Sequence, residues 1–173
     1  RFVADASPLI REKAIEALGR MGASERRNVI IQSMNDKEGR VRAAALAALQ
    51  RLQGPNLEKV VVPLLQDSEG VVREQAIALL GVIPEGQSLS LVRDRLKDDD
   101  PRVRRQAAEV LSVKGEGEDL SEVLTLLDDR IPWVRARVAP LVGRMGAQWT
   151  KGPAKERLVY ALRASERDSE WEV

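Results

Sequence analysis

Five arginines recur at intervals of 31 residues, and each follows an aspartate by six residues. The arginines are Arg11, Arg42, Arg73, Arg104 and Arg135, and the aspartates are Asp5, Asp36, Asp67, Asp98 and Asp129. A guanidinium group presents a planar fork of N–H donors that matches a carboxylate or an anionic ligand. The arginines therefore form either a ligand-binding row or a structural set of ion pairs. We favour the structural alternative, in which each arginine bonds the aspartate of its own or the next repeat, together with carbonyl groups at helix ends.

Other residue types that carry chemistry are missing or unsuitably spaced. The sequence has no histidine and no cysteine, which excludes imidazole catalysis, cysteine nucleophiles and zinc sites with Cys or His ligands. The acids at positions 98–100 lack the alternating ligands and central glycine of a calcium loop. Gly81 and Gly86 have the spacing of a phosphate-binding loop, but Gln87 stands where its lysine would be. The sequence thus predicts no enzyme, no metal and no cofactor.

The composition is that of a chain that folds around an apolar core. It has 173 residues, of which 43% are hydrophobic, and 28 basic residues balance 27 acidic ones. Such a balance gives no bulk attraction to nucleic acid or to an anionic membrane. No apolar run approaches the roughly 18 residues of a membrane-spanning helix. We therefore expect no membrane partner, and the cytoplasm is the default compartment.

The elements that carry the arginines repeat with the same period. In the third copy, apolar residues at helical spacing form one stripe, which consists of Val72, Ala76, Leu79, Leu80 and Ile83. A preceding helix ends at each aspartate. Two copies place a capping side chain before a proline at the first helical position, as Ser7-Pro8 and Asp100-Pro101. No segment alternates with a period of two, so the sequence predicts helix pairs and no sheet.

The repeated pattern resembles a known family. Each copy has Asp, then Val-Arg or Ile-Arg five residues later, then Ala or Val three residues after the Arg and Leu or Val at seven. This pattern is similar to the short HEAT-like repeat first noted in phycobilisome lyase subunits. The resemblance implies an all-α fold, a right-handed α-α superhelix (α-solenoid) of about five 31-residue helix pairs, with the second helix of each pair on the concave side. Short helix pairs cannot bury their apolar faces alone, so they stack into one core.

We expect a single domain over residues 1–173, with repeat cores near 5–22, 36–53, 67–83, 98–113 and 129–146. The next acid of the series falls at Tyr160, and the best substitute is Asp168, so an incomplete unit begins there. Both ends of the sequence cut through repeats, which predicts a fragment of a longer solenoid. Four apolar residues near the ends are poor caps of a stack and predict end-to-end self-association: Phe2, Val3, Trp171 and Val173.

In the implied geometry, the outward positions of the second helices form the concave surface. Eight of these positions are basic and four are acidic, and Trp and Arg are enriched in protein–protein contacts. The predicted partner-binding residues are Leu9, Lys13, Arg40, Arg51, Val71, Arg102, Arg105, Trp133, Arg137 and Arg144. Gly39, Ala43 and Ala44 are also predicted to face solvent there. The main hypothesis is a non-catalytic scaffold that binds a protein partner along this surface.

Two other functions stay open. A weakly basic concave surface also suits the backbone of a nucleic acid, although Glu12, Glu16, Glu74 and Glu109 interrupt its positive charge and one tryptophan offers little base stacking. The repeat subtype also resembles that of phycobilin lyases, so a lyase-like accessory subunit is the second alternative.

Overall fold

The computed structural model describes residues 2–83, 88–115, 118–144 and 159, and these residues form helices and turns but no strand. The expected all-α solenoid is confirmed, because the helices follow one another in pairs and, within each unit, each pair packs on the next. Two compact units result, Arg1–Ser88 (unit 1) and Leu89–Val173 (unit 2). Each unit is described by itself below.

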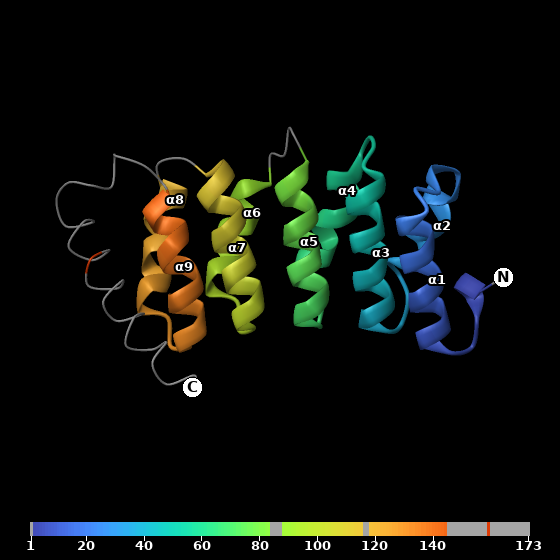
Figure 1. The fold of residues 1–173 in the computed structure, drawn as a ribbon, viewed down its shortest axis with the longest axis horizontal. Helices are drawn as coiled ribbons and strands as arrows, with labels where there is room; N and C mark the ends of the chain where they lie inside the picture. Colours follow the sequence, from blue (N-terminus) through green and yellow to red (C-terminus); the bar gives the residue numbers. More distant parts are fainter. Residues whose placement is uncertain (1, 84–87, 116–117, 145–158, 160–173) are drawn as a thin grey trace. The chain divides into compact units, whose positions relative to one another are not determined.

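Unit 1 is built on the helices α1 (Pro8–Arg20), α3 (Gly39–Leu52) and α5 (Gly70–Val82), which are the second helices of their repeats. They run side by side, because α1 packs against α3 and α3 packs against α5 (Figure 1). The first helices are α2 (Arg27–Ser33) and α4 (Leu57–Val61), which pack on α3 and α5 respectively. Three short 3₁₀ helices complete the described part of the unit: η1 (Phe2–Ala4), η2 (Ser24–Arg26) and η3 (Val62–Gln66).

Unit 2 repeats the same plan. Its second helices, α7 (Pro101–Lys114) and α9 (Pro132–Arg144), pack against each other (Figure 1). The first helices are α6 (Leu89–Asp94), which continues into η4 (Arg95–Lys97), and α8 (Glu118–Leu124), which continues into η5 (Thr125–Asp128). α6 packs on α7, and η5 packs on α9.

The core follows the period of the sequence. The position four residues after each of the first four repeat arginines is fully buried, and it is occupied by Ile15, Leu46, Ile77 and Ala108. These side chains lie one turn beyond the arginine, on the side of the second helix that faces the neighbouring helices. Burying one Leu or Ile side chain stabilises a fold by about 1.5–3 kcal/mol. Burial of these side chains therefore stabilises the stacking of the repeats.

The first helices end at the repeat aspartates, as the pattern predicts. The N–H groups of Asp67, Asp98 and Asp129 donate to the carbonyl oxygen three residues earlier, each at 3.2 Å, which closes a 3₁₀ turn. Pro63 lies in η3, but η4 and η5 contain no proline. The 3₁₀ turn at the end of the first helix is therefore a property of the repeat and does not depend on proline.

Several predicted features lie outside the described residues. They include the break of register at Tyr160, the incomplete unit from Asp168, and the end residues Trp171 and Val173. The last two positions of the repeat core 129–146 lie outside as well.

Close packing of α1 on α3 depends on a glycine. A Cβ atom added to Gly19 would lie 2.7 Å from Cβ and 2.8 Å from Cα of Ala48 on α3. Gly143 occupies the matching position of α9 and is exposed, and an added Cβ there meets nothing within 4 Å among the described residues.

We expect Gly19→Ala and Gly143→Ala to change the free energy of unfolding in opposite directions. Alanine at position 143 gains about 0.5–1 kcal/mol from helix propensity. At position 19 the same gain is outweighed, because overpacking against the backbone of α3 costs about 1–3 kcal/mol. Urea unfolding followed by circular dichroism measures both. Equal stabilisation by the two substitutions would show that α1 and α3 can move apart at position 19 with no loss of free energy of unfolding, which would contradict the prediction.

Candidate functional site

The repeat arginines and aspartates form an ordered set of ion pairs, which we call the Asp–Arg ladder. Nε and Nη2 of Arg11 donate to Oδ2 and Oδ1 of Asp36, both at 2.7 Å. Arg42 holds Asp67 with the same two atoms at the same two distances. In unit 1 the carboxylate therefore belongs to the next repeat, and each guanidinium joins two consecutive helix pairs.

Unit 2 contains the same two-pronged contact. Nε and Nη2 of Arg104 donate to Asp129 at 2.7 and 2.8 Å. The two side chains are only 6% and 4% exposed. Burial on this scale makes a charge costly unless its partner and hydrogen bonds are complete, and the fork geometry meets that requirement.

The remaining guanidinium nitrogen binds within its own repeat. Nη1 of all five ladder arginines donates to the backbone carbonyl oxygen of the aspartate six residues earlier, at 2.7–2.9 Å. These carbonyls lie at the turn between the first and second helix, where helix geometry leaves them without a partner. Each arginine thus closes the turn of its own repeat, and in the described pairs it also binds the aspartate of the next repeat.

Each ladder aspartate has a further role that the sequence analysis missed. Its Oδ1 accepts the backbone N–H two residues later, at 2.8–3.0 Å in all five copies. This turn orients the carboxylate toward the arginine.

Of the two predicted helix caps, one is confirmed and one is wrong. Asp100 accepts the N–H of Arg102 at 2.9 Å. The prediction for Ser7 is wrong, because its side chain makes no capping hydrogen bond.

A second acid also links repeats in unit 1. Oε1 of Glu69 accepts the N–H of Gly39 at 3.0 Å and lies 3.5 Å from Nη2 of Arg42. A carboxylate is favourable at the N-terminus of a helix such as α3, and glycine leaves room for it. The signal for this contact was present in the sequence, because Glu38, Glu69 and Asp100 are themselves 31 residues apart.

The ladder changes the proton affinity of its acids. The hydrogen bond from Arg11 is the main cause that lowers the pKa of Asp36. Burial raises the pKa of Asp67 and of Asp129. Hydrogen bonds to Asp67 from Arg42, to Asp129 from Arg104, and to each acid from the local backbone outweigh this effect, so the net shift of both pKa values is downward. The guanidinium groups of the three paired arginines have raised pKa values, chiefly through the same hydrogen bonds. All members of these pairs are charged at neutral pH.

The ladder members at the edges of the units make the same local contacts. Arg73 in unit 1 and Arg135 in unit 2 each bind the carbonyl of their own repeat. Asp98 in unit 2 accepts the N–H of Asp100, and Asp5 in unit 1 accepts that of Ser7. In each fully described pair, the guanidinium donors of the arginine are already bonded to an aspartate and to backbone carbonyls. This argues against a ligand-binding row of arginines.

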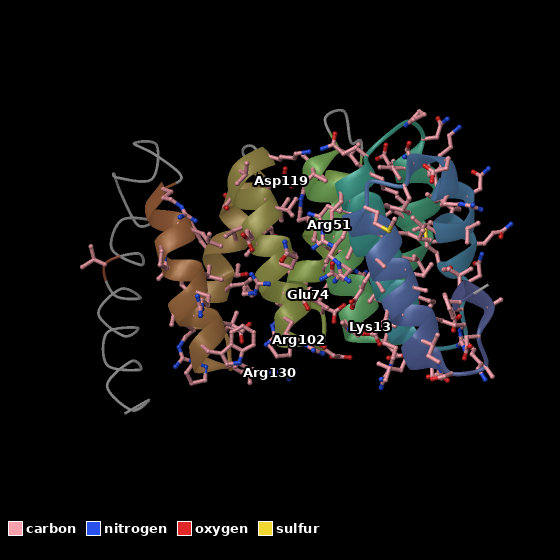
Figure 2. All side chains as sticks on the ribbon, turned by 45° about the vertical axis from the view of Figure 1, so that its right-hand side comes forward. Lys13, Arg51, Glu74, Arg102, Asp119 and Arg130 are labelled. Atoms are coloured by element: carbon pink, nitrogen blue, oxygen red, sulfur yellow. The ribbon has the colours of Figure 1, made fainter. Side chains whose placement is uncertain are left out.

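The predicted partner-binding residues of unit 1 lie on α1, α3 and α5. Leu9 is 53% exposed, and Val71 is half-buried. The side chain of Lys13 is 58% exposed but binds Glu16 at 3.0 Å. Arg40 and Arg51 are exposed, and neither makes an ion pair with a described residue. Figure 2 shows Lys13 on α1, Arg51 on α3 and Glu74 on α5.

Three positions predicted to face solvent are instead buried. Ala43 and Ala44 are 7% and 8% exposed, and Gly39 is also buried. The reason is that α3 has a neighbouring second helix on both sides, and a side chain as short as that of alanine does not reach beyond them. The middle of the unit 1 surface is therefore shallow, with its charges at the two ends of α3.

Unit 2 carries the other half of the predicted set. Arg102 is exposed and held by Asp100 at 2.7 Å, and Arg105 is held by Glu109 at 2.7 Å. On α9, Trp133 is half-buried, while Arg137 and Arg144 are exposed and make no ion pair with a described residue. Figure 2 shows Arg102 and Arg130 as exposed cations of this unit.

Comparison with known proteins identifies the repeats. A sequence profile of HEAT repeats matches residues 1–61 and 58–141. The chain belongs to the HEAT repeat family. A search of the curated proteins gives no significant match.

Two solved structures share the HEAT-type fold of this chain. Both are crystal structures of engineered proteins from the Northeast Structural Genomics Consortium. One is 15% identical with a TM-score of 0.60 and covers 98% of this chain and 96% of that chain. The other is 16% identical with a TM-score of 0.55 and covers 98% and 94%. At this level of identity the likeness concerns the fold alone.

The described residues of this HEAT protein offer no metal site: no group of three or more acidic, His or Cys side chains among them is placed to hold a metal ion. None of the described helices has the length and apolar character that crossing a membrane requires.

Breaking the ladder in unit 2 is expected to destabilise the protein far more than breaking its neighbour. Arg104→Gln leaves a buried Asp129 without its guanidinium, and loss of one partner of a buried pair costs about 3–5 kcal/mol. Arg102→Gln removes an exposed arginine from the same helix and costs at most about 1 kcal/mol. Urea unfolding of both variants measures the difference. Similar losses would show that the ladder has no special role.

Acid is expected to loosen the ladder. A carboxyl whose pKa is lowered by folding stabilises the folded state above its ordinary pKa of about 4, and this contribution is lost as pH falls through the lowered value. The thermal midpoint should therefore fall steeply below about pH 4. Asp67→Asn should flatten that fall, whereas Glu25→Gln, which changes an exposed acid, should leave it unchanged. Parallel pH profiles of wild type and Asp67→Asn would contradict the assignment.

Proposed function

We propose that this HEAT protein is a non-catalytic interaction scaffold, which binds a protein partner on the exposed side of its second helices. Each unit offers its own contact residues among those predicted from the sequence. They are Leu9, Lys13, Arg40, Arg51 and Val71 in unit 1, and Arg102, Arg105, Trp133, Arg137 and Arg144 in unit 2. The observation that supports it best is on α9, where a half-buried tryptophan accompanies two exposed arginines that make no ion pair with a described residue.

The exposed charge of unit 2 is unevenly distributed over its helices. On α9, Arg137 and Arg144 are exposed and the helix carries no acid, whereas α8 and η5 carry four acids and no basic residue. A partner that approaches α9 therefore meets a positive surface. Complementary charge steers association and selects among partners, so the fitting partner is a protein segment that carries acidic residues.

Trp133 and Arg137 supply the central contact in this proposal. They lie four residues apart on α9 and so share one side of the helix. Tryptophan and arginine are the residue types that most often dominate binding energy. Trp133 is half-buried, and Arg137 has no ion pair among the described residues that would have to be broken first.

A protein partner fits this surface better than a nucleic acid does. Binding along a phosphate backbone needs several free cations in a row, whereas Arg102 and Arg105 are each neutralised by an acid within hydrogen-bond distance. In unit 1, Glu12 and Glu16 similarly hold Lys13. On α9, Arg137 and Arg144 make no ion pair with a described residue and stand seven residues apart, an arrangement that suits individual carboxylates of a protein.

The test is affinity capture from a nuclease-treated lysate of the source cells. The baits are the wild type, a Trp133→Ala/Arg137→Glu variant, and Lys97→Glu as a matched control that reverses an exposed cation on η4. We expect one protein to be retained by the wild type and the control and lost by the double variant. Calorimetry with that protein should give an affinity loss of about 30-fold or more, as for a binding hot spot.

Other outcomes have definite meanings. Equal retention by all three baits would place the contact elsewhere on the chain. Capture that is seen only in a parallel lysate without nuclease treatment would replace the protein partner with a nucleic acid.

A further inference from the structure

Two cations of α3 stand out on the outer side of unit 1, by which we mean the exposed side of α1, α3 and α5. Arg40 and Arg51 are exposed, and neither makes an ion pair with a described residue. They lie eleven residues apart near the two ends of α3, which is about three turns, so both project from one side of the helix, about 16 Å apart along its axis. Helix α3 packs against both α1 and α5, so its outer side is open with both neighbouring second helices in place.

The charged side chains on the outer side of α1, by contrast, neutralise one another. Nζ of Lys13 lies 3.0 Å from Glu16 and 3.4 Å from Glu12. Nη1 of Arg20 lies 3.7 Å from Glu16. On α5 the one charged residue outside the ladder is Glu74, which is half-buried (Figure 2). The exposed positive charge of unit 1 that a partner meets without an acid beside it is therefore that of the two α3 arginines.

An apolar side chain of α5 accompanies each of these arginines in the repeat register. Val71 and Val82 follow Arg40 and Arg51 by 31 residues and so occupy the matching positions of the next second helix. Val82 is 43% exposed, and Val71 is half-buried. A carboxylate bound at either arginine therefore has apolar surface nearby. Such surface excludes water and strengthens an ion pair.

The outer side of α3 between the two arginines favours a helical occupant. It carries Ala43, Ala44 and Ala47, which offer no hydrogen-bonding side chain, and the backbone groups of α3 are bonded within the helix. An extended segment laid along it would bury N–H and C=O groups without partners, at a cost of about 1–3 kcal/mol for each. A helix bonds these groups internally, so it can lie on this surface without that cost.

We infer that the outer side of unit 1 binds a helix of the partner protein that lies along α3 and carries two carboxylates eleven residues apart. One carboxylate bonds Arg40 and the other bonds Arg51, while apolar residues beside them pack on Val71 and Val82. The spacing of the acids equals that of the arginines, because both helices rise by about 1.5 Å per residue. This inference rests on the proposed function, since it specifies the segment that the partner presents to unit 1.

The test measures binding of a fluorescent helical peptide to the full chain by anisotropy. The peptide is alanine-rich, about 20 residues long so that it is helical in water, and has two glutamates eleven residues apart with a leucine beside each. A comparison peptide of the same composition has its second glutamate two residues earlier, which turns that carboxylate to the opposite side of the helix. We expect saturable binding of the first peptide and binding of the second that is weaker by about fivefold or more.

Substitution of the two arginines tests the register. Arg40→Gln and Arg51→Gln should each weaken binding of the first peptide by about three- to fivefold, the range expected for one ion pair. Replacing one glutamate of the peptide with glutamine should cancel the effect of one arginine substitution and leave the effect of the other. Circular dichroism verifies that the peptides are helical and that the variants are folded.

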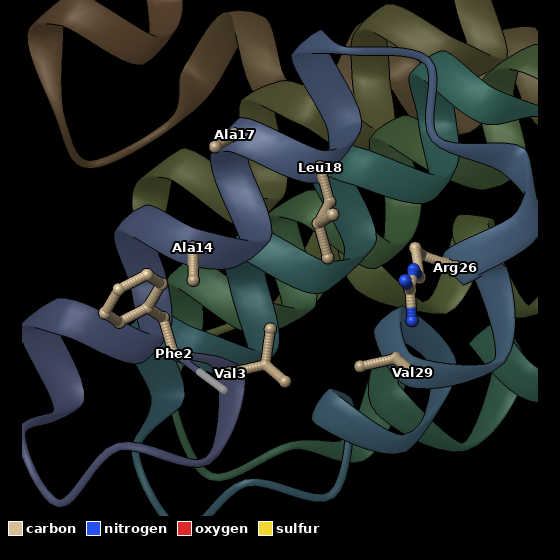
Figure 3. Close-up of a pocket in the computed structure, with 7 residues that line it drawn as sticks. All are labelled: Phe2, Val3, Ala14, Ala17, Leu18, Arg26 and Val29. Atoms are coloured by element: carbon tan, nitrogen blue, oxygen red, sulfur yellow. The ribbon is translucent and has the colours of Figure 1, made fainter.

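Two control variants change the charge of unit 1 elsewhere, and neither should alter binding of the first peptide. Lys59→Glu reverses an exposed cation of α4. Ala17→Lys adds a cation to the apolar groove of about 460 Å³ between η1, α1 and α2, which opens on another side of α1 (Figure 3). Equal binding of the two helical peptides, no binding of either, or a loss with Ala17→Lys that the α3 substitutions do not cause would overturn the inference.

The outcome can be told apart from that of the proposed function. A captured partner that is lost by Trp133→Ala/Arg137→Glu but binds Arg40→Gln/Arg51→Gln as tightly as wild type would overturn the inference and leave the scaffold proposal in place. If the lysate yields no protein, the scaffold proposal fails, whereas discrimination between the two peptides would still support the site on α3.

Discussion

The structure depends on one contact, in which an arginine fork closes the turn of its own repeat and holds the carboxylate of the next. An apolar stripe alone fixes neither the register nor the angle between two stacked helix pairs, because apolar contacts are non-directional. The fork has directed donors and accepts a carboxylate in one orientation. Arg11 and Arg42 in unit 1 and Arg104 in unit 2 use the same atoms at nearly the same distances. Within a unit, each such contact holds one helix pair on the next in a defined orientation.

This arrangement separates the charges of the protein into two groups. The side chains of the three described ladder pairs are little exposed and neutralise each other, so they hold the architecture and are not available to a ligand. The charges on the outer side of the second helices are exposed, and several are balanced by an acid on the same helix, such as Lys13 by Glu16. Arg137 and Arg144 make no ion pair with a described residue, so under the proposed function they are the charges with which a partner gains most. A stacked fold thus gains specificity from local differences between its repeats.

The sequence by itself determined the helix pairs, their period, the ends of the first helices and the identity of the ladder residues, because these follow from spacing along one chain. It left open whether Arg11 binds the acid of its own or of the next repeat, since both lie within reach of a flexible side chain. Only the tertiary structure decided for Asp36, because packing of α1 on α3 at Gly19 sets the distance between repeats. It also decided that Ala43 and Ala44 are buried and that Glu69 caps α3. Those outcomes depend on neighbours that are about 30 residues away in sequence, and helical periodicity carries no information about them.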